Sequence, residues 1–427
     1  MKTNLNLVIY YNKNNRYSFN SLLGAIEIDE RLKDINVIFI NKKEDLFNLS
    51  QLIDKDTKNL FLFSFFTTQI FEILDLVKKL REIYKDKILI VGGGPHPTGE
   101  PLGPLKMGFD YIFRGEGEES FIKFLINLIE NKDFENIKGI SSKKDGEFNI
   151  SQLSDPVDIN LYPPFSIKYE KFSPIEITRG CPFFCFYCQT PYIFSGKIRH
   201  RSIENIIKYI EIMKKLNLVD IRFITPNAFS YGSKDGKSLN LNSLEELLKE
   251  IKRVLKDKGR IFLGTFPSEV RPDFVLEETL ILLKKYASND SIVIGAQSGS
   301  ERVLSLINRG HGVKEIYKSV ELSIKFNIKP IVDFIFGLPG EEEEDIEDTL
   351  KVMKDLVQMG AKIHAHTFIP LPQTPFQFKK SGKVDEKIKN FIKENLKDKI
   401  VFGDWGVQQK LGKKIEEYFK KNYNYLQ

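Results

Sequence analysis

The sequence contains three cysteines, and all of them lie in one short stretch at Cys181, Cys185 and Cys188. This C-x3-C-x2-C spacing can supply three thiolates to one metal centre. Three thiolates would bind three irons of a four-iron cluster and leave the fourth iron open to a ligand, as in metal sites that perform chemistry. Because no cysteine remains for a structural disulfide, the pattern is typical of a reducing, cytoplasmic location.

A zinc site is the alternative that this spacing leaves open, with a histidine such as His200 as the fourth ligand. Zinc ligands usually come as two short-spaced pairs with a longer gap between them, and this sequence has no second pair. The spacing therefore favours an iron–sulfur cluster. A non-catalytic zinc or electron-transfer protein stays open as the alternative from another functional class.

Alternating strand-like and helix-like segments are predicted to position the cysteines within residues 174–375. Six βα repeats of this kind predict a partial (β/α)6 barrel, in which functional residues gather at the carboxyl ends of the strands. The cysteines follow the first predicted strand, and polar or glycine-rich segments follow the others. The predicted strands span residues 175–179, 219–224, 260–266, 291–296, 331–336 and 363–369.

Three polar side chains on the last two predicted strands are candidate catalytic residues, for substrate contact or proton transfer. Asp333 lies among apolar residues, where a buried carboxylate needs a partner. His364 and His366 alternate along the next strand and therefore share one face. A satisfied polar pair or an exposed strand end is the alternative interpretation of the two histidines.

Residues 1–150 form a separate predicted domain with βαβα order, which is typical of a doubly wound parallel sheet that binds ligands beyond the carboxyl ends of its strands. A proline-containing linker follows at 151–173. A basic helical tail is predicted at 376–427, where 13 lysines face 7 acidic residues. The predicted strands of the first domain span residues 5–11, 35–40, 60–66, 88–91 and 111–114.

The overall composition, 41% hydrophobic and 29% charged, is ordinary for a soluble globular protein. The formal net charge of +6 equals the excess of the tail. Without interleaved aromatic residues, this basic tail favours solvated lysine-rich helices over a nucleic-acid surface. No apolar run is long enough for a transmembrane helix, and the N-terminus lacks the apolar region of a signal peptide.

These segments together resemble the radical S-adenosylmethionine (SAM) superfamily, in the branch with an N-terminal cobalamin-binding-like domain, and most closely its uncharacterised archaeal members. C-x3-C-x2-C with Tyr187 before the third cysteine is the signature of that superfamily. Other stretches look like later motifs of the branch and like its cobalamin domain. These stretches are residues 295–300, 337–341 and the Pro-Leu-Pro segment 370–372 for the barrel, and 91–97 and 110–118 for the first domain.

The resemblance implies a 4Fe-4S cluster on the three cysteines, SAM on its open iron, and a 5′-deoxyadenosyl radical as the reactive product. It also implies cobalamin in the first domain and an electron donor such as ferredoxin or flavodoxin. The residues expected to contact SAM are Tyr187, Asn227, Glu269, Ser298 and Arg309. The residues expected to contact cobalamin are Gly92, Gly93, Gly94 and His96.

One departure from the branch bears on cobalamin. Many cobalamin domains carry D-x-H-x-x-G after the first strand, where the histidine binds cobalt, but residues 11–18 of this chain contain no histidine. The resemblance still implies a cobalamin-dependent methyltransferase that acts on an unactivated carbon of a small-molecule or lipid substrate, whereas the missing histidine motivates an alternative without cobalamin. A radical SAM enzyme that performs oxidation, cyclisation or coupling without cobalamin is the alternative. Methylthiolation is disfavoured because no cysteines remain for a second cluster.

Overall fold

The computed structural model describes residues 5–51, 53, 57–144 and 146–423. They form two compact units, one of residues 1–173 with 371–373 and one of residues 174–370 with 374–427. No helix among the described residues combines the length and the apolar character that a membrane span requires.

A seven-stranded sheet forms the centre of the first unit, in the order β2-β1-β3-β4-β5-β6-β7. The first five strands along the chain pair in parallel, and β6 and β7 add an antiparallel edge. This confirms the doubly wound sheet, whose strand order reverses between β1 and β3 while the strands stay parallel. The strands are β1 (Leu5–Tyr10), β2 (Asn36–Ile40), β3 (Lys58–Ser64), β4 (Leu89–Gly93), β5 (Tyr111–Phe113), β6 (Ile140–Lys144) and β7 (Glu147–Asn149).

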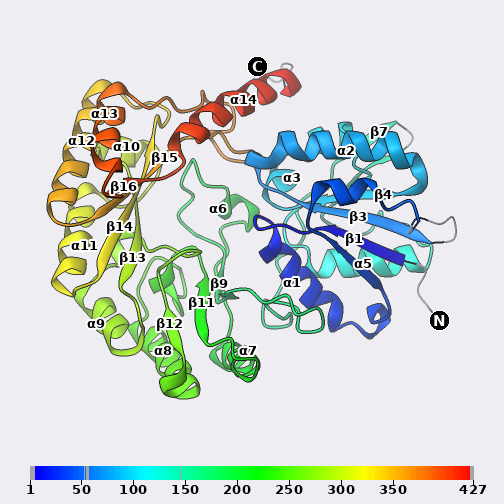
Figure 1. Ribbon diagram of the computed structural model, residues 1–427, viewed down its shortest axis with the longest axis horizontal. Coiled ribbons are helices and arrows are strands. Elements are labelled where there is room, and N and C mark those ends of the chain that lie inside the picture. The colour runs from blue at the N-terminus through cyan, green and yellow to red at the C-terminus, as the bar shows by residue number, and fades with distance from the viewer. Residues whose placement is uncertain (1–4, 52, 54–56, 145, 424–427) are drawn as a thin grey trace. The chain divides into compact units, whose positions relative to one another are not determined.

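Helices cover both faces of this sheet because its strands alternate between two apolar faces (Figure 1). Leu7 of β1 packs with α1 (Arg16–Glu27) and α5 (Glu118–Ile129) on one face. Val8, the next residue, packs with α2 (Ile70–Tyr84) on the other face. Two short helices follow β4: α3 (Pro95–Gly99) and α4 (Leu102–Lys106).

The second unit is a curved parallel sheet in two hydrogen-bonded parts, β12-β11-β8 and β13-β14-β15-β16. An isolated parallel bridge between Val270 and Ile294 joins the two parts, so the strands form a partial barrel. The strands are β8 (Ile175–Glu176), β11 (Asp220–Ile224), β12 (Arg260–Phe262), β13 (Ser291–Gln297), β14 (Lys329–Phe336), β15 (Lys362–Thr367) and β16 (Val401–Phe402), and a small antiparallel pair is formed by β9 (Thr178–Arg179) and β10 (Arg199–His200).

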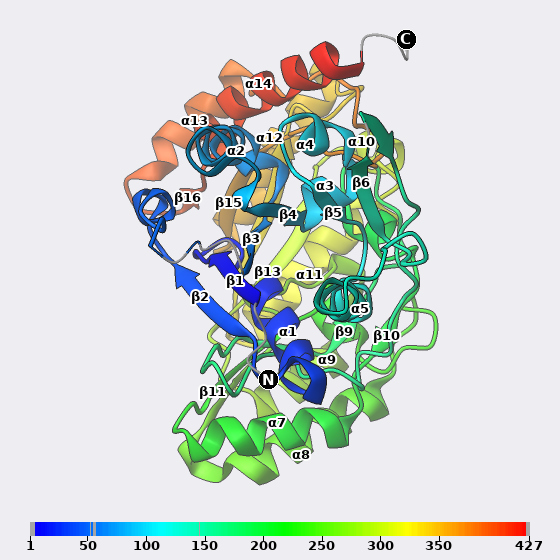
Figure 2. The same cartoon turned by 90° about the vertical axis from the view of Figure 1, so that its right-hand side faces the viewer.

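Amphipathic helices form the outer layer of this barrel. In α8, for example, apolar residues recur at Leu244, Leu247, Leu248 and Ile251, and all four are buried. Helices α7 and α8 lie side by side (Figure 2). The helices of the unit are α6 (Thr190–Ile193), α7 (Ile203–Lys215), α8 (Leu241–Leu255), α9 (Glu277–Tyr286), α10 (Glu301–Leu306), α11 (Val313–Lys325), α12 (Glu343–Gln358), α13 (Glu386–Leu396) and α14 (Trp405–Tyr423).

The tail differs from the purely helical segment predicted from its composition. Residues 401–402 form β16, which pairs in parallel with β15 at the edge of the barrel sheet. Val401 is completely buried, and the glycine after the strand, Gly403, has a positive φ of 128°. The tail predicted as helical therefore contains a short edge strand, because its apolar residues complete the packing of β15.

Candidate functional site

The cysteine loop begins directly after β9, where the chain turns sharply at Gly180. Its φ is +90°, and a Cβ at this position would lie 1.9 Å from the carbonyl oxygen of Lys197, so a side chain cannot be accommodated. All three cysteines are free thiols, and Cys185 is buried. The backbone N–H of Cys188 donates to the carbonyl of Cys185 over 3.0 Å, which keeps the loop compact.

The segment after α10 holds this loop in place. The N–H of Phe186 donates to the carbonyl of Ile307 over 3.0 Å. The amide Nδ2 of Asn308 donates to the carbonyls of Phe183 and Phe184 over 3.0 and 3.1 Å. The loop is therefore fixed by hydrogen bonds to a segment more than 100 residues later in the chain.

The spacing of the three thiols suits a cluster better than a single zinc ion. Their sulfur atoms do not all lie within 4.8 Å of one another, whereas thiolates on one tetrahedral zinc ion are about 3.8 Å apart at Zn–S bonds of about 2.3 Å. A four-iron cube spaces its ligands more widely because each thiolate binds a different iron. His200 offers no free nitrogen for zinc, since Nδ1 contacts Thr178 Oγ1 at 2.9 Å and Nε2 contacts the Ser233 carbonyl at 2.8 Å.

The electrostatics of the thiols indicate a site that needs a cationic partner. Burial, and then the nearby Cys185, raise the pKa of the Cys188 thiol to about 12. Burial also raises the pKa of Cys181. Thiolates are the form that binds iron, and the positive charge of bound irons would compensate their burial. The donor set therefore fits the cluster that the sequence predicts.

A buried guanidinium lies against this loop. Arg309 donates from Nη1 to Sγ of Cys185 over 3.6 Å and from Nη2 to the carbonyl of Gly295 over 2.5 Å. Its Nε donates to Nε2 of His311 over 3.0 Å. Burial disfavours the cation, but the neighbouring Tyr187, Cys185 and Glu269 together hold the pKa of Arg309 above its ordinary value. Arg309 is thus a fixed positive charge beside the cysteines.

Gly295 on β13 leaves a space that polar groups surround. A Cβ at this position would lie 2.7 Å from Oε2 of Glu269 and 2.8 Å from both Nη2 of Arg309 and Nε2 of Gln297. Burial, and then the charge of Asp333, raise the pKa of Glu269 to about 7. Gln297 is buried with a φ of 77°, an unusual conformation for a residue other than glycine that is often found at functional sites. We call the space formed by Gly295, Glu269, Gln297 and Arg309 the cradle. It suits a polar ligand beside the cysteines.

Two buried donors near the loop lack a hydrogen-bond partner among the described residues: Nδ2 of Asn227 and Nη1 of Arg271. The Oδ1 of Asn227 accepts the backbone N–H of Arg271 over 3.3 Å, so the two residues are neighbours. The guanidinium carbon of Arg271 lies 3.5 Å from the ring centroid of Phe183 in the cysteine loop. Unpartnered buried donors are costly unless a ligand accepts from them, and a carboxylate is the group that fits.

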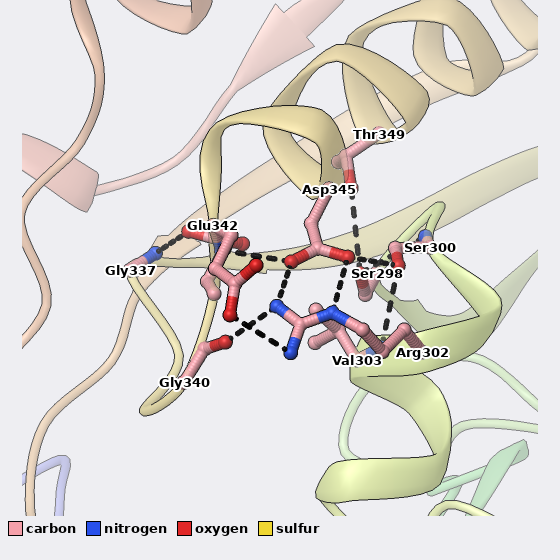
Figure 3. Close-up of polar contacts among 10 residues, drawn as sticks. Ser298, Ser300, Arg302, Val303, Gly337, Gly340, Glu342, Asp345 and Thr349 are labelled. Carbon is pink, nitrogen blue, oxygen red and sulfur yellow. Dashed lines mark hydrogen bonds and ion pairs between the residues drawn. The ribbon is translucent and has the colours of Figure 1, made fainter.

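Ser298 and Tyr187 are two of the residues expected to contact SAM, and their hydroxyl groups lie in different surroundings. The hydroxyl of Ser298 contacts Thr349 Oγ1 at 3.3 Å and accepts the N–H of Ser300, so it ties β13 to α12 (Figure 3). Its predicted contact with SAM stays a prediction, since that hydroxyl already has partners. Tyr187 is close to Arg309, and burial raises the pKa of its hydroxyl.

The three candidate catalytic side chains lie together on neighbouring strands. Nδ1 of His364 is 3.0 Å from Oδ1 of Asp333 and 3.1 Å from Nε2 of His366. Asp333 is in register with both Gly295 and His364, so the three residues present the same face of the sheet. The structure therefore brings the predicted group to the face that also carries Glu269 and Arg309.

In the first unit, the predicted cobalamin contacts surround the carboxyl end of β4. Gly94 has a φ of +94°, and a Cβ there would lie 2.7 Å from Ser64 Oγ. Gly93 is more open, with its nearest neighbour, Cβ of Phe113, at 3.8 Å. A flat ligand can approach the backbone at Gly93, while Gly94 allows β3 and β4 to pack closely.

His96 is completely buried below this end of the sheet. Its ring stacks on Phe65 with centroids 5.6 Å apart, Nδ1 contacts Thr67 Oγ1 at 3.1 Å, and Nε2 lies 3.4 Å from Oε2 of Glu100. These contacts give His96 a packing role, and its predicted contact with cobalamin stays a prediction.

Four residues of the barrel site were missing from the sequence-based set: Arg271, Gln297, His311 and Gln408. Gln297 and Arg271 stood in segments that follow predicted strands, which was the available signal. Gln408 lies on the tail helix α14 and donates from Nε2 to Nδ1 of His366 over 3.2 Å. No local pattern connects a tail residue with a strand more than 40 residues earlier.

Comparison with known proteins finds a family model that matches part of each unit. Residues 27–125 match the B12 binding domain, and residues 175–353 match the Radical SAM superfamily. An uncharacterized methyltransferase of Pyrococcus horikoshii is 26% identical over 294 residues, which are 66% of this chain and 61% of that protein. A tRNA-2-methylthio-N(6)-dimethylallyladenosine synthase of Moorella thermoacetica is 31% identical over 202 residues, 47% of this chain and 43% of that enzyme. The chain thus spans less than two thirds of the length of either relative.

The fold is shared with a solved radical SAM methyltransferase, TsrM from Kitasatospora setae, whose structure contains cobalamin and a 4Fe-4S cluster. The TM-score is 0.67, and the match covers 88% of this chain and 78% of TsrM at 15% sequence identity. At this identity the likeness establishes the arrangement of elements. It confirms the predicted combination of a parallel-sheet domain and a barrel.

Proposed function

Because the chain carries a radical SAM domain preceded by a B12-binding domain, we propose that it is a cobalamin-dependent radical SAM methyltransferase that acts on an unactivated carbon. The observation that carries the proposal is the set of three free thiols beside a buried cation and two unpartnered buried donors. Structural zinc sites need no such surroundings. The substrate is proposed to be a small molecule or a lipid.

The barrel residues would hold the cluster and SAM as follows. Cys181, Cys185 and Cys188 would bind the cluster, and Asn227 and Arg271 would donate to the carboxylate of SAM from their unpartnered atoms. When bound and reduced, the cluster would supply the electron that cleaves the sulfonium bond of SAM into methionine and a 5′-deoxyadenosyl radical.

The cradle above Gly295 completes this site. The side chains of Glu269 and Arg309 would bind and orient the polar groups of SAM there. Neutral Glu269 can donate a hydrogen bond, because its raised pKa keeps it partly protonated near pH 7.

Reconstitution tests the radical part of this proposal. The full chain, loaded anaerobically with iron and sulfide, should bind about four irons and should release 5′-deoxyadenosine from SAM after reduction with flavodoxin or ferredoxin, the donor class proposed here. The variant Cys185→Ser should lose both properties, whereas Glu211→Gln, on the outer helix α7, should retain them. Zinc alone after anaerobic purification, or reduction without deoxyadenosine, would contradict the proposal.

A radical SAM reaction without cobalamin is the second candidate, and a specific observation favours it. The loop after β1 is closed on itself, since Oδ1 of Asn12 accepts the N–H groups of Asn14 and Asn15 and Nδ2 of Asn15 donates to the Tyr10 carbonyl. The loop carries no imidazole, and the ring of His96 is buried in the packing of the unit. This unit would therefore offer cobalt no histidine ligand, which removes one of the contacts that would hold cobalamin there.

Hydroxocobalamin binding separates the two candidates. Stoichiometric binding by the full chain, with a shifted visible spectrum and with methyl transfer from labelled SAM, is expected for the methyltransferase. Substitution of Gly93 by Val should weaken that binding, because the side chain would occupy the open backbone surface at the end of β4. Normal deoxyadenosine formation without any cobalamin binding would support the second candidate.

A further inference from the structure

A group of metal-ligating side chains, separate from the cysteines, lies on strands β14 and β15. One ligand atom each from Asp333, His364 and His366 lies within 4.8 Å of the other two, and no other three or more His, Cys, Asp or Glu residues gather in this way among the described residues. The two shortest separations are 3.0 Å from Oδ1 of Asp333 to Nδ1 of His364 and 3.1 Å from that nitrogen to Nε2 of His366.

The strands fix this arrangement. Asp333 and His364 are direct partners in the parallel pairing of β14 and β15, and His366 follows two residues later on the same face. The ring of Phe402 on β16 stacks on His364 with centroids 4.8 Å apart and ring planes at 15°. The ligand atoms thus converge because of strand register and packing, so little rearrangement is needed to bring them to one ion.

Hydrogen bonding alone does not satisfy these contacts. The backbone N–H of Thr367 donates to Oε1 of Gln408 over 2.8 Å, which directs Nε2 of Gln408 to Nδ1 of His366. Neutral His366 then carries its proton on Nε2, opposite Nδ1 of His364. Nδ1 of His364 has a single lone pair to accept that proton, yet it also lies next to the carboxylate of Asp333. One of the two short contacts of Nδ1 therefore lacks the proton that a hydrogen bond requires.

We propose that Asp333, His364 and His366 bind a divalent first-row transition-metal ion. An ion would accept all three lone pairs at once, and two histidines with one carboxylate are a donor set that leaves coordination positions open, as in Fe²⁺ sites, and that also suits Zn²⁺ and Mn²⁺. Bonds of about 2.1 Å at right angles place adjacent ligand atoms about 3.0 Å apart, which agrees with the two separations observed.

The open positions identify the class of ligand. The three side chains share a sheet face with Gly295, above which Glu269 and Arg309 converge beside Cys185. A hard or borderline ion there would bind an oxygen of the substrate, from a carboxylate, a hydroxyl or a phosphate group. In this respect the inference deepens the proposed function, since it names the substrate feature that the barrel would hold. The ion site itself does not depend on cobalamin or on SAM.

Gln408 provides a second, independent test of the site. A metal ion on Nε2 of His366 moves the ring proton to Nδ1, which must then donate to an acceptor. In the present arrangement Nδ1 faces the amide nitrogen of Gln408, whose oxygen is held by Thr367. A carboxylate at position 408 could accept from both groups at once. The variant Gln408→Glu should therefore bind the ion more tightly, by about tenfold.

Titration of the full, cluster-loaded chain with Mn²⁺ tests the site, with free Mn²⁺ measured by room-temperature electron paramagnetic resonance under anaerobic conditions. We expect one saturable Mn²⁺ per chain, and at least about tenfold weaker binding in Asp333→Asn, His364→Gln and His366→Gln. His200→Gln is the matched control, a half-buried histidine outside the group, and should bind like the parent. Unchanged iron content shows that each variant is folded.

Three outcomes would overturn the inference. They are the absence of a saturable site, equal affinity in the parent and the three ligand variants, and equal loss in the His200 control. Weaker binding in Gln408→Glu would overturn the predicted role of position 408 in orienting His366, and the absence of a saturable site would leave the three side chains as a hydrogen-bonded group only. None of these readouts requires SAM cleavage, so failure of the ion site and failure of the proposed function are distinguishable.

Discussion

Nε of Arg309 donates to Nε2 of His311 over 3.0 Å, and this contact orients the guanidinium whose Nη1 reaches Sγ of Cys185. The other ring nitrogen of His311 lies 3.3 Å from the carbonyl of Gly312. Burial, and then the charges of Arg309 and Arg271, lower the pKa of His311 to about 2, so the ring stays neutral and acts as an acceptor. His311 is thus a positioning residue for a cation beside the cysteines.

Loss of this orientation should lower the reduction potential of the cluster. A hydrogen bond and a positive charge at a cluster sulfur favour the reduced, more negative state. We expect His311→Leu to lower the potential by on the order of 50 mV, which corresponds to about 1 kcal/mol for one electron. His311→Gln, whose amide oxygen can accept from Nε, should restore most of it. Potentiometric titration of the reconstituted chain measures the shift, and equal potentials in parent and Leu variant would contradict the role.

Glu269 should make the stability of the cluster-free chain fall as the pH rises. Its pKa is raised in the folded state to about 7, from a usual value near 4.5, because burial and the charge of Asp333 disfavour its carboxylate. The unfolded chain therefore releases this proton at lower pH than the folded chain, and stability is lost between about pH 4.5 and 7. Urea unfolding at pH 5 and pH 8 should show this loss. In Glu269→Gln the difference between the two pH values should shrink by a few kcal/mol.

Gly295→Ala should block the cradle without unfolding the barrel. The added Cβ would meet the ends of Glu269, Arg309 and Gln297, which are side chains that can move, and the φ of Gly295 is compatible with alanine. We expect normal iron loading but at least about tenfold slower deoxyadenosine formation, since displaced polar groups misplace SAM. Gly406→Ala is the matched control, because a Cβ there meets nothing within 4 Å. Equal rates in the two variants would refute the cradle.

Asp345→Asn should destabilise the barrel while leaving the cluster in place. The carboxylate of Asp345 accepts from the hydroxyl of Ser300 over 2.6 Å and pairs with Arg302, so it joins α12 to the start of α10 (Figure 3). Despite its burial, these partners hold the pKa of Asp345 below its usual value, so its contribution is present above about pH 4 and is lost on acidification. The variant should lose about 1–3 kcal/mol at pH 7 by urea unfolding, with unchanged iron content.

Much of the architecture could be predicted from local pattern. The cysteine spacing indicated the cluster, and the alternation of strands and helices indicated both the doubly wound sheet and the partial barrel. Such signals are local because a side-chain period of two or 3.6 residues reports the burial of one element. The tail was the exception. Val401 and Phe402 are too few to show a strand period, and only their pairing with β15 makes them β16.

The sequence by itself determined which chemistry this protein can support, since Cys181, Cys185 and Cys188 lie on one loop at a spacing that no folding step can change. The tertiary structure decided which groups surround them. Arg309, which His311 orients, reaches the loop from more than 100 residues away, and Gln408 reaches His366 from the tail. These contacts depend on strand register and helix packing over long sequence separations, which local periodicity does not encode.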